Sequence, residues 1–285
     1  MTMPTLDTQA IYDLTHRQMA FTDAAQNMMT YLWQEWGGYV GQLSWVTKGQ
    51  LKQLAQKAAL ARDSITLDIC CGTGGIARHL AQTTGCTMTG VDYSVTAIEI
   101  ARSASSGHGE AVQFDMGDVR KLPYPDAHFD AAVSVDSLAI VPELPRVLAE
   151  CARVLKPGGR IAFLDEILGG PPTRDLDILQ AMGTYGRIYP QTESSYRRLL
   201  THVGFVDIEI SDSTDMFVAI NHRWAESYRR YEPEVRKALG DKWFNEGLAF
   251  FMALESEGAA GRLRQILVSA TLRPDSPRAQ ESRSG

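Results

Sequence analysis

The segment LDICCGTGG (67–75) combines a carboxylate with a glycine-rich turn, and this combination can bind a charged cofactor. An apolar run leads into the turn, and a helical stretch follows it. Glycines let the backbone approach a ligand closely, and ligands of open α/β sheets bind at the carboxyl ends of strands. Spacing alone leaves the ligand open, because Gly72-x-Gly74-x-x-Ala77, with Asp92 about twenty residues later, also fits the dinucleotide fingerprint.

The charge at the turn helps to separate the two candidate cofactors. A pyrophosphate favours helix N–H groups without a nearby anion, whereas Asp68 places a carboxylate on the segment that leads into the turn. A carboxylate attracts a ligand with an ammonium or sulfonium group, and S-adenosylmethionine (SAM) carries both. Asp92 can accept hydrogen bonds from ribose hydroxyls in either case. The pattern favours SAM, with a nicotinamide dinucleotide as the alternative.

The elements that must position this turn are short apolar runs that alternate with helical segments. The expected strands are 65–70, 86–92, 111–115, 129–135 and 160–166, and the expected helices between them are 75–82, 95–104 and 143–155. Apolar strands separated by helices are typical of βα units on a parallel sheet. The sequence thus predicts an α/β fold with a Rossmann-like, doubly wound sheet.

Helical additions are expected on both sides of this core. They comprise helices within 8–60, further helices at 173–182 and 192–202, and a helical insertion over 216–260 between strand-like runs at 205–211 and 264–272. We therefore divide the chain into an N-terminal helical lid (1–62), a cofactor-binding core (63–168), acceptor-capping helices with the last two strands (169–272), and a loose polar tail (273–285).

Four motifs in order carry a resemblance to a known family. LDICCGTGG, GVDYS (90–94), MGDVRKLPYPDAHFD (116–130) and RVLKPGGRIAF (153–163) resemble the successive motifs of class I SAM-dependent methyltransferases. The resemblance implies a seven-stranded, mostly parallel sheet whose last strand is antiparallel. The stretch YLWQEWGG is similar to the lid helix of small-molecule methyltransferases that act on glycine-type amines, tocopherol precursors and prenyl substrates.

The resemblance implies a set of cofactor contacts. Asp68 and the glycine turn would hold the methionine end of SAM, Asp92 would hold the ribose, and Asp118 would accept a hydrogen bond from the adenine amino group. The complete implied set is Asp68, Gly72, Thr73, Gly74, Asp92, Tyr93, Asp118, Val119 and Ser134.

Candidates on the acceptor side follow from the chemistry of methyl transfer. The leaving group is already excellent, so the enzyme mainly aligns the nucleophile and excludes water, and no fixed catalytic motif is expected. Glu166, at the end of the fifth predicted strand, is the first candidate for a general base or a cation-stabilising carboxylate, with Tyr185 and His222 as further catalytic candidates. The expected acceptor contacts are Trp36, Asp136, Arg187, Tyr189 and Arg223.

These residues favour a SAM-dependent methyltransferase that modifies a carbon or nitrogen of a small-molecule metabolite. One sharper version is C-methylation of an isoprenoid or its diphosphate, in which aromatic rings and Glu166 stabilise a carbocation and cationic side chains hold the anionic group. A nicotinamide-dependent oxidoreductase and a non-catalytic SAM-binding protein remain as alternatives.

The composition of the chain limits the kinds of binding partner that it can have. The 285 residues include 28 Lys+Arg and 34 Asp+Glu, for a net charge of −6, and this acidic balance without a basic run disfavours a nucleic-acid partner. No apolar run approaches the roughly 18 residues of a membrane span, and the N-terminus does not resemble a signal peptide. The 4 cysteines lack zinc-finger spacing. No metal ligands are assigned, and whether a divalent metal assists stays open. We expect a cytoplasmic protein with a small-molecule acceptor, and leave open whether it is a homo-oligomer.

Overall fold

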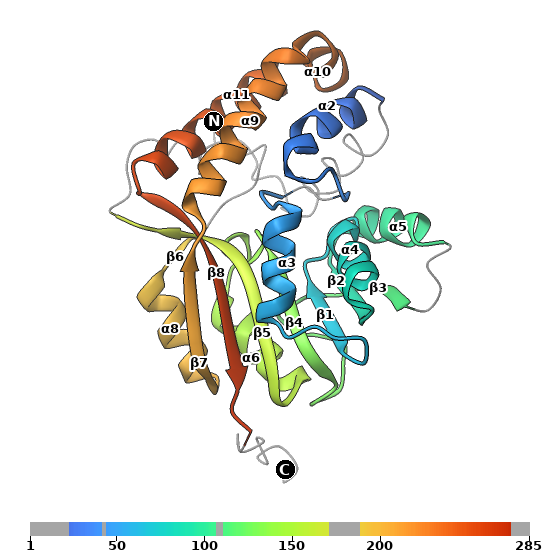
Figure 1. Ribbon diagram of the computed structural model, residues 1–285, viewed down its shortest axis with the longest axis vertical. Coiled ribbons are helices and arrows are strands. Elements are labelled where there is room, and N and C mark those ends of the chain that lie inside the picture. The colour runs from blue at the N-terminus through green and yellow to red at the C-terminus, as the bar shows by residue number, and fades with distance from the viewer. Residues whose placement is uncertain (1–22, 42–43, 107–110, 171–188, 275–285) are drawn as a thin grey trace, which may run out of the picture.

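A single mixed sheet organises the computed structural model, which describes residues 23–41, 44–106, 111–170 and 189–274 (Figure 1). In the described ranges the strands follow the order β3-β2-β1-β4-β5-β8-β7, and a short strand, β6, pairs with β5. The strands are β1 (Ile65–Ile69), β2 (Thr87–Asp92), β3 (Val112–Met116), β4 (Phe129–Val135), β5 (Leu155–Leu168), β6 (Gln191–Thr192), β7 (Phe205–Asp212) and β8 (Leu263–Leu272).

The direction of the strands confirms the predicted sheet. Strands β1 to β5 pair in parallel, whereas β8 is antiparallel to both β5 and β7. Glu166 of β5 lies opposite Gln265 of β8, and Ile69 of β1 lies opposite Ser134 of β4. The seven-strand path and its antiparallel final strand therefore agree with the expected methyltransferase-type topology.

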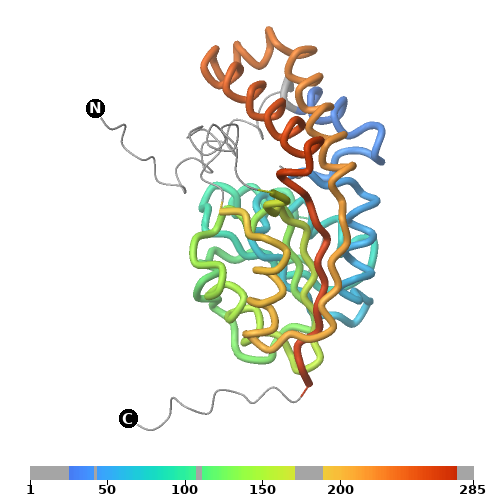
Figure 2. The backbone as a smooth tube through the Cα atoms, turned by 90° about the vertical axis from the view of Figure 1, so that its left-hand side faces the viewer, coloured from blue at the N-terminus to red at the C-terminus, as the bar shows by residue number. Residues whose placement is uncertain are grey.

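Helices cover both faces of the sheet, as Figure 2 shows from the side. One apolar core includes residues of α3 (Lys48–Lys57), α4 (Gly75–Thr84) and α5 (Val95–Ala104), and the other includes residues of α6 (Leu144–Val154) and α8 (Glu193–His202). The strand residues between them are apolar on both sides, which is why the strand runs are nearly continuous in hydrophobicity.

A third apolar cluster lies above the ends of the strands, where α2 (Asp23–Trp33) packs with α9 (Thr214–Arg230), α10 (Glu232–Leu239) and α11 (Asp241–Ala259) (Figure 1). The rings of Trp224 and Phe251 stack with their centroids 4.7 Å apart. Leu168, the last residue of β5, pairs with Leu263, the first residue of β8, so α11 leads into the sheet at the carboxyl end of β5. This helical group therefore stands over the edge at which ligands bind.

Most element boundaries agree with expectation within one or two residues, and the largest differences are in the 216–260 block and at the start of β5. The predicted helical block 216–260 is divided into three helices, with α10 carrying a proline in its first turn and Gly240 (φ 85°) separating α10 from α11. Strand β5 begins at Leu155 instead of residue 160, because Leu155 pairs with Phe129 ahead of a register shift. The predicted helix at 173–182 lies outside the described residues.

No helix among the described residues is long and apolar enough to cross a membrane. Within the same residues, no group of three or more His, Cys, Asp or Glu side chains is arranged to hold a metal ion.

Candidate active site

The turn after β1 adopts a backbone conformation that requires glycine. Gly72 and Gly74 have φ values of 52° and 74°, a region in which a Cβ atom is strained. A Cβ at Gly74 would also lie 2.3 Å from Cζ of Phe114, so this position has no room for a side chain. The turn thereby presents bare backbone at the carboxyl end of β1.

Two carboxylates converge on this turn. Asp68 is buried in β1, and its Oδ2 has no hydrogen-bond partner. Burial, together with the nearby negative charge of Asp92, raises the pKa of Asp68 to about 8. Asp92, at the end of β2, accepts hydrogen bonds of 2.9 Å from the backbone N–H groups of Gly72 and Ser94. A buried carboxylate oxygen without a donor is costly, so this site fits a ligand with a positive charge.

The N-terminal segment lies against the same turn. The hydroxyl of Thr73 donates a hydrogen bond of 2.9 Å to the carbonyl of Gly41, and Nη1 of Arg78 donates one of 2.9 Å to the carbonyl of Thr73. A Cβ at Gly75 would lie 2.4 Å from the carbonyl oxygen of Val40. Residues before the sheet therefore form one wall of the crevice.

The loop after β3 holds the expected adenine contacts. Asp118 is exposed and forms an ion pair of 2.9 Å with Arg120, and this hydrogen bond lowers its pKa. Val119 is buried in the sheet core, and Tyr93 is half-buried directly after Asp92. The Asp118 carboxylate is therefore exposed and held by Arg120.

The end of β4 begins the acceptor side. The buried hydroxyl of Ser134 donates a hydrogen bond of 3.1 Å to the carbonyl of Ile69, so this side chain joins β4 to β1. Two residues later, Asp136 adopts a left-handed conformation (φ 47°) that is uncommon outside glycine. Such strain concentrates at functional sites.

Asp136 and Glu166 form a pair of neighbouring carboxyl groups, which we call the carboxyl pair. Asp136 accepts hydrogen bonds from the backbone N–H of Trp45 (2.5 Å) and from Nε2 of Gln265 (3.0 Å). It is also hydrogen-bonded to Glu166. Burial raises the pKa of Asp136 to about 6, and burial with the adjacent carboxylates raises the pKa of Glu166 well above its ordinary value.

Asp165 faces the opposite side of β5 from Glu166, because successive strand residues alternate. Its carboxylate accepts hydrogen bonds from the hydroxyl of Tyr196 and from the backbone N–H of Ala139 (3.1 Å). Burial raises its pKa to about 7. Asp165 thus ties α8 and the turn after β4 to the strand that carries Glu166.

Three residues of this network were not among the expected site residues: Trp45, Gln50 and Gln265. Gln265 is fully buried in β8, a strand that also contains Arg264, Ser269 and Thr271. Its residue type alone therefore did not mark it as a site residue. Gln50 completes a capping box with Thr47 and also donates a hydrogen bond of 3.1 Å to Oε1 of Gln265.

Two expected functional residues on α9 are engaged elsewhere. The guanidinium of Arg223 lies 3.8 Å from the ring centroid of Tyr31 and pairs with Glu226 at 2.8 Å. Nδ1 of His222 lies 2.9 Å from Glu255, and the His222 side chain is 59% exposed. These contacts hold the helical group together and do not join either residue to the carboxyl pair.

The remaining expected residues are placed as follows. Trp36 is half-buried and packs edge-on against Trp33, with ring centroids 6.0 Å apart. Tyr189 is 40% exposed, and its backbone N–H donates a hydrogen bond of 2.5 Å to the carbonyl of Ala139, close to the end of β4. Tyr185 and Arg187 lie outside the described residues.

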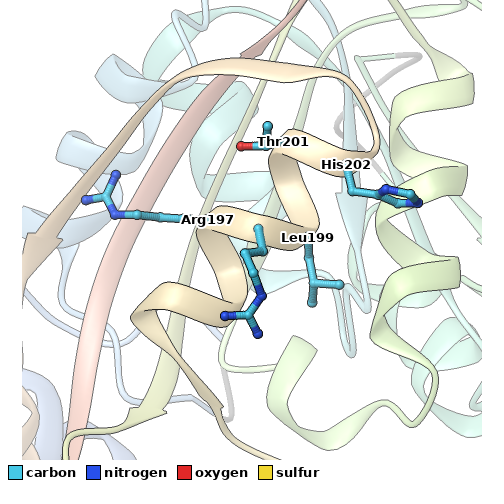
Figure 3. Close-up of a pocket in the computed structure, with 5 residues that line it drawn as sticks. Arg197, Leu199, Thr201 and His202 are labelled. Carbon is cyan, nitrogen blue, oxygen red and sulfur yellow. The ribbon is translucent and has the colours of Figure 1, made fainter.

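A surface pocket of about 610 Å³ lies away from this crevice, along α8 (Figure 3). It is lined by Arg197, Arg198, Leu199, Thr201 and His202. In Figure 3 the side chains of Arg197 and His202 point in opposite directions, and Arg197 pairs with Glu193 of the same helix. The pocket contains none of the carboxylates described above.

Comparison with known proteins agrees with this geometry. Residues 67–163 match the family described as a methyltransferase domain. The chain is 37% identical over 121 residues to methyltransferase GfsG of Streptomyces halstedii, over 42% of this chain and 44% of that protein. It is 28% identical over 253 residues to 27-O-demethylrifamycin SV methyltransferase of Amycolatopsis mediterranei, over 84% of this chain and 92% of that protein. The match thus spans less than half of GfsG but nearly all of the second relative.

Solved structures share the fold. A putative sarcosine dimethylglycine methyltransferase from Galdieria sulphuraria superposes with a TM-score of 0.75 at 19% identity, over 88% of this chain and 98% of that one. Haemonchus contortus phosphoethanolamine N-methyltransferase 2, solved with SAM, superposes with a TM-score of 0.74 at 19% identity. The superposition covers 92% of this chain and 60% of that one.

The fold, the glycine turn and the matched domain define a nucleoside-cofactor enzyme of the Rossmann-like type. Residues 67–163 form a methyltransferase domain, and the chain is similar to the class I SAM-dependent methyltransferases, whose methyl donor is SAM. The nicotinamide-dependent alternative does not fit this class.

Proposed function

We propose that the chain transfers the SAM methyl group to a small-molecule metabolite whose reacting atom meets the carboxyl pair. The observation that carries this proposal is the presence of two carboxylate sites on adjacent strands. Asp68 and Asp92 lie at the glycine turn, and the carboxyl pair lies at the ends of β4 and β5. Ser134 lies opposite Ile69, so both sites share one edge of the sheet. A donor at the first site would face an acceptor at the second.

The first site has the chemistry to hold SAM. The Asp68 oxygen that has no partner would receive the ammonium group, and this contact would favour the charged carboxylate. Asp92 would accept hydrogen bonds from the ribose hydroxyls, and Gly72, Thr73 and Gly74 would contact the methionine end. Tyr93, Asp118 and Val119 would flank the adenine. When bound, SAM supplies a methyl group activated by a positively charged sulfur.

The carboxyl pair has the chemistry to receive a proton. When an N–H or O–H acceptor forms a bond to the methyl carbon, the electrons of the carbon–sulfur bond return to sulfur and the acceptor must lose its proton. The carboxylate of Asp136 can accept that proton, while Glu166 keeps its own. A carbon acceptor would use the same carboxylate to remove a proton after attack.

The negative charge of the carboxyl pair limits which kinds of acceptor can bind beside it. A hydroxyl or an amine can donate a hydrogen bond to the carboxyl pair, whereas a diphosphate placed there would be repelled. Arg223 is already paired with Glu35 and Glu226. The isoprenoid diphosphate hypothesis therefore depends on Arg187, outside the described residues. The observations favour the uncharged or cationic acceptor.

The helical group formed by α2, α9, α10 and α11 would cap the acceptor. It stands over the strand ends (Figure 1) and presents half-buried aromatic rings such as Trp45 and Tyr39 next to its core. An enclosed, aromatic cap suits a small apolar metabolite with a polar reacting group. The similarity to 27-O-demethylrifamycin SV methyltransferase over 84% of the chain supports a small-molecule metabolite as the acceptor.

Two measurements test the proposed function. Calorimetry with S-adenosylhomocysteine should show binding, and NADH should show none. Methyl-labelled SAM, incubated with a panel of hydroxyl, amine, isoprenoid and prenyl diphosphate metabolites, should label an acceptor that lacks a diphosphate. Labelling of only the diphosphates would support the isoprenoid version. Binding without any labelled product across the panel would favour a non-catalytic SAM-binding protein.

A further inference from the structure

Gln265 uses its whole amide group at the acceptor side of the crevice. It is fully buried in β8, and its Nε2 donates hydrogen bonds to Oδ1 of Asp136 (3.0 Å) and to the carbonyl of Trp45 (3.2 Å). Its Oε1 accepts a hydrogen bond of 3.1 Å from Nε2 of Gln50. One side chain thus joins the end of β4 to two residues of the N-terminal part of the chain.

The two members of the carboxyl pair differ in the number of hydrogen-bond donors that they receive. Asp136 receives an N–H donor on each oxygen, one from Trp45 and one from Gln265. Oε1 of Glu166 is buried without a donor. Donors stabilise a carboxylate, and two neighbouring carboxylates do not both ionise readily. The negative charge therefore lies on Asp136, and the shared proton lies on Glu166.

We propose that Gln265 is a positioning residue for methyl transfer, which keeps the charge of the carboxyl pair on Asp136 while the 45–50 segment is docked. The inference rests on the proposed function, since it assigns a role to the carboxyl pair in proton acceptance. Because the backbone of Trp45 supplies the other donor, Gln265 and the docked 45–50 segment together hold the charge on Asp136. A base that is ionised only under a closed wall is protected from water.

Other titratable groups do not account for this asymmetry. Asp165 lies on the opposite side of β5 from Glu166, and its carboxylate is hydrogen-bonded to Tyr196 on α8. Asp165 raises the pKa of Glu166, so it strengthens the preference for a proton there. The two groups that donate to Asp136, the backbone N–H of Trp45 and the amide of Gln265, are both neutral.

The test compares two glutamine variants of the full chain. Gln265→Met keeps the side-chain volume but removes the donor to Asp136. Gln50→Met leaves that donor in place and removes the contact to Oε1 of Gln265, together with the Gln50 contacts to Thr47 and Ser213. Carbon-13 NMR of labelled Asp and Glu carboxyl groups, assigned with Asp136→Asn and Glu166→Gln, gives the titration midpoint of each group. We expect Gln265→Met to raise the Asp136 midpoint by about one to two pH units, and Gln50→Met to leave it close to wild type.

Parallel measurements separate a positioning role from a structural one. Both variants should bind S-adenosylhomocysteine as the wild type does, because Gln265 lies outside the proposed cofactor contacts. A structural role alone would lower the melting temperature without moving the Asp136 midpoint, and that result would overturn the inference. If Gln265→Met does not fold, Gln265→Glu, which has nearly the same shape, should also raise the midpoint.

The two proposals fail in different ways. If the wild type does not bind S-adenosylhomocysteine, the proposed function is wrong whatever the titration shows. If it binds and the Asp136 midpoint is the same in wild type and Gln265→Met, the cofactor assignment stands and the role of Gln265 is wrong.

Discussion

The backbone N–H of Trp45 donates a hydrogen bond of 2.5 Å to Oδ2 of Asp136, a residue 91 positions later in the chain. The indole of Trp45 also donates, through Nε1, a hydrogen bond of 2.7 Å to Asn221 of α9. Trp45 therefore connects the segment before α3, the end of β4 and helix α9. A change in any one of these three parts should alter the hydrogen bonding of Asp136.

Replacing Asp92 by alanine should weaken binding of S-adenosylhomocysteine by roughly 1–3 kcal/mol, the scale for loss of a charged hydrogen-bond partner. Isothermal calorimetry measures this change directly. Asp126→Ala is the matched control, because Asp126 is an exposed carboxylate that pairs with Arg153 at a distance from the turn. Equal affinity in the two variants would show that the ribose assignment is wrong.

Asp68 should make the ligand-free protein less stable as the pH rises. Its folded pKa of about 8 exceeds the ordinary value of 3.8, so the folded state holds this proton more tightly than the unfolded state. The stabilisation is fully present below the unfolded pKa and is lost as pH rises through about 8. Urea unfolding across this range should show a smaller decline for Asp68→Asn than for wild type.

The same variant should also respond differently to the cofactor. Asp68→Asn removes the charge that would pair with the ammonium group, so SAM should raise its melting temperature less than that of the wild type. A wild-type stability that does not change with pH in this window would contradict the burial of an unpaired carboxylate here.

Gly75→Ala should loosen the N-terminal wall of the crevice. The added Cβ would lie 2.4 Å from the Val40 carbonyl oxygen, so the segment at 38–41 must move away from α4. We expect faster limited proteolysis of this segment and weaker cofactor binding. Gly49→Ala is the control: its Cβ would come no closer than 3.7 Å to a neighbour, and alanine should stabilise helix α3 by about 0.5–1 kcal/mol. Equal proteolysis in both variants would argue against the wall.

Arg223→Ala should lower the free energy of unfolding and should have little effect on acceptor binding. The side chain is only 12% exposed, and it joins α9 to Tyr31 and Glu35 of the N-terminal part. We expect the free energy of unfolding to fall by roughly 1–3 kcal/mol. Arg229→Ala, an exposed arginine on the same helix, should change it much less. Unchanged stability together with a raised KM for the acceptor would instead support the original expectation that Arg223 binds substrate.

The core of the fold was readable from local patterns. Each strand of the βα units is an apolar run bounded by turn residues, and the predicted limits of α5 and β4 coincide with the structure. The glycine turn and the position of Asp92 were also predictable. A strand followed by glycines and a helix is a local pattern, so its residues are positioned by their neighbours in the sequence.

Side chains on the acceptor side were not predictable in this way. Arg223 and His222 had the residue types of an anion site, but their partners come from α2, the following segment and α11. Gln265 donates to the carbonyl of Trp45 across 220 positions of the chain. Nothing in the local sequence around either residue indicates that contact.

The sequence by itself determined the class of cofactor chemistry, since a carboxylate, a glycine turn and a second carboxylate are set by adjacent residues along two strands. Only the tertiary structure decided which acceptor-side carboxylate carries the charge. That property depends on burial and on N–H donors, and both are supplied by segments that meet only when the chain has folded.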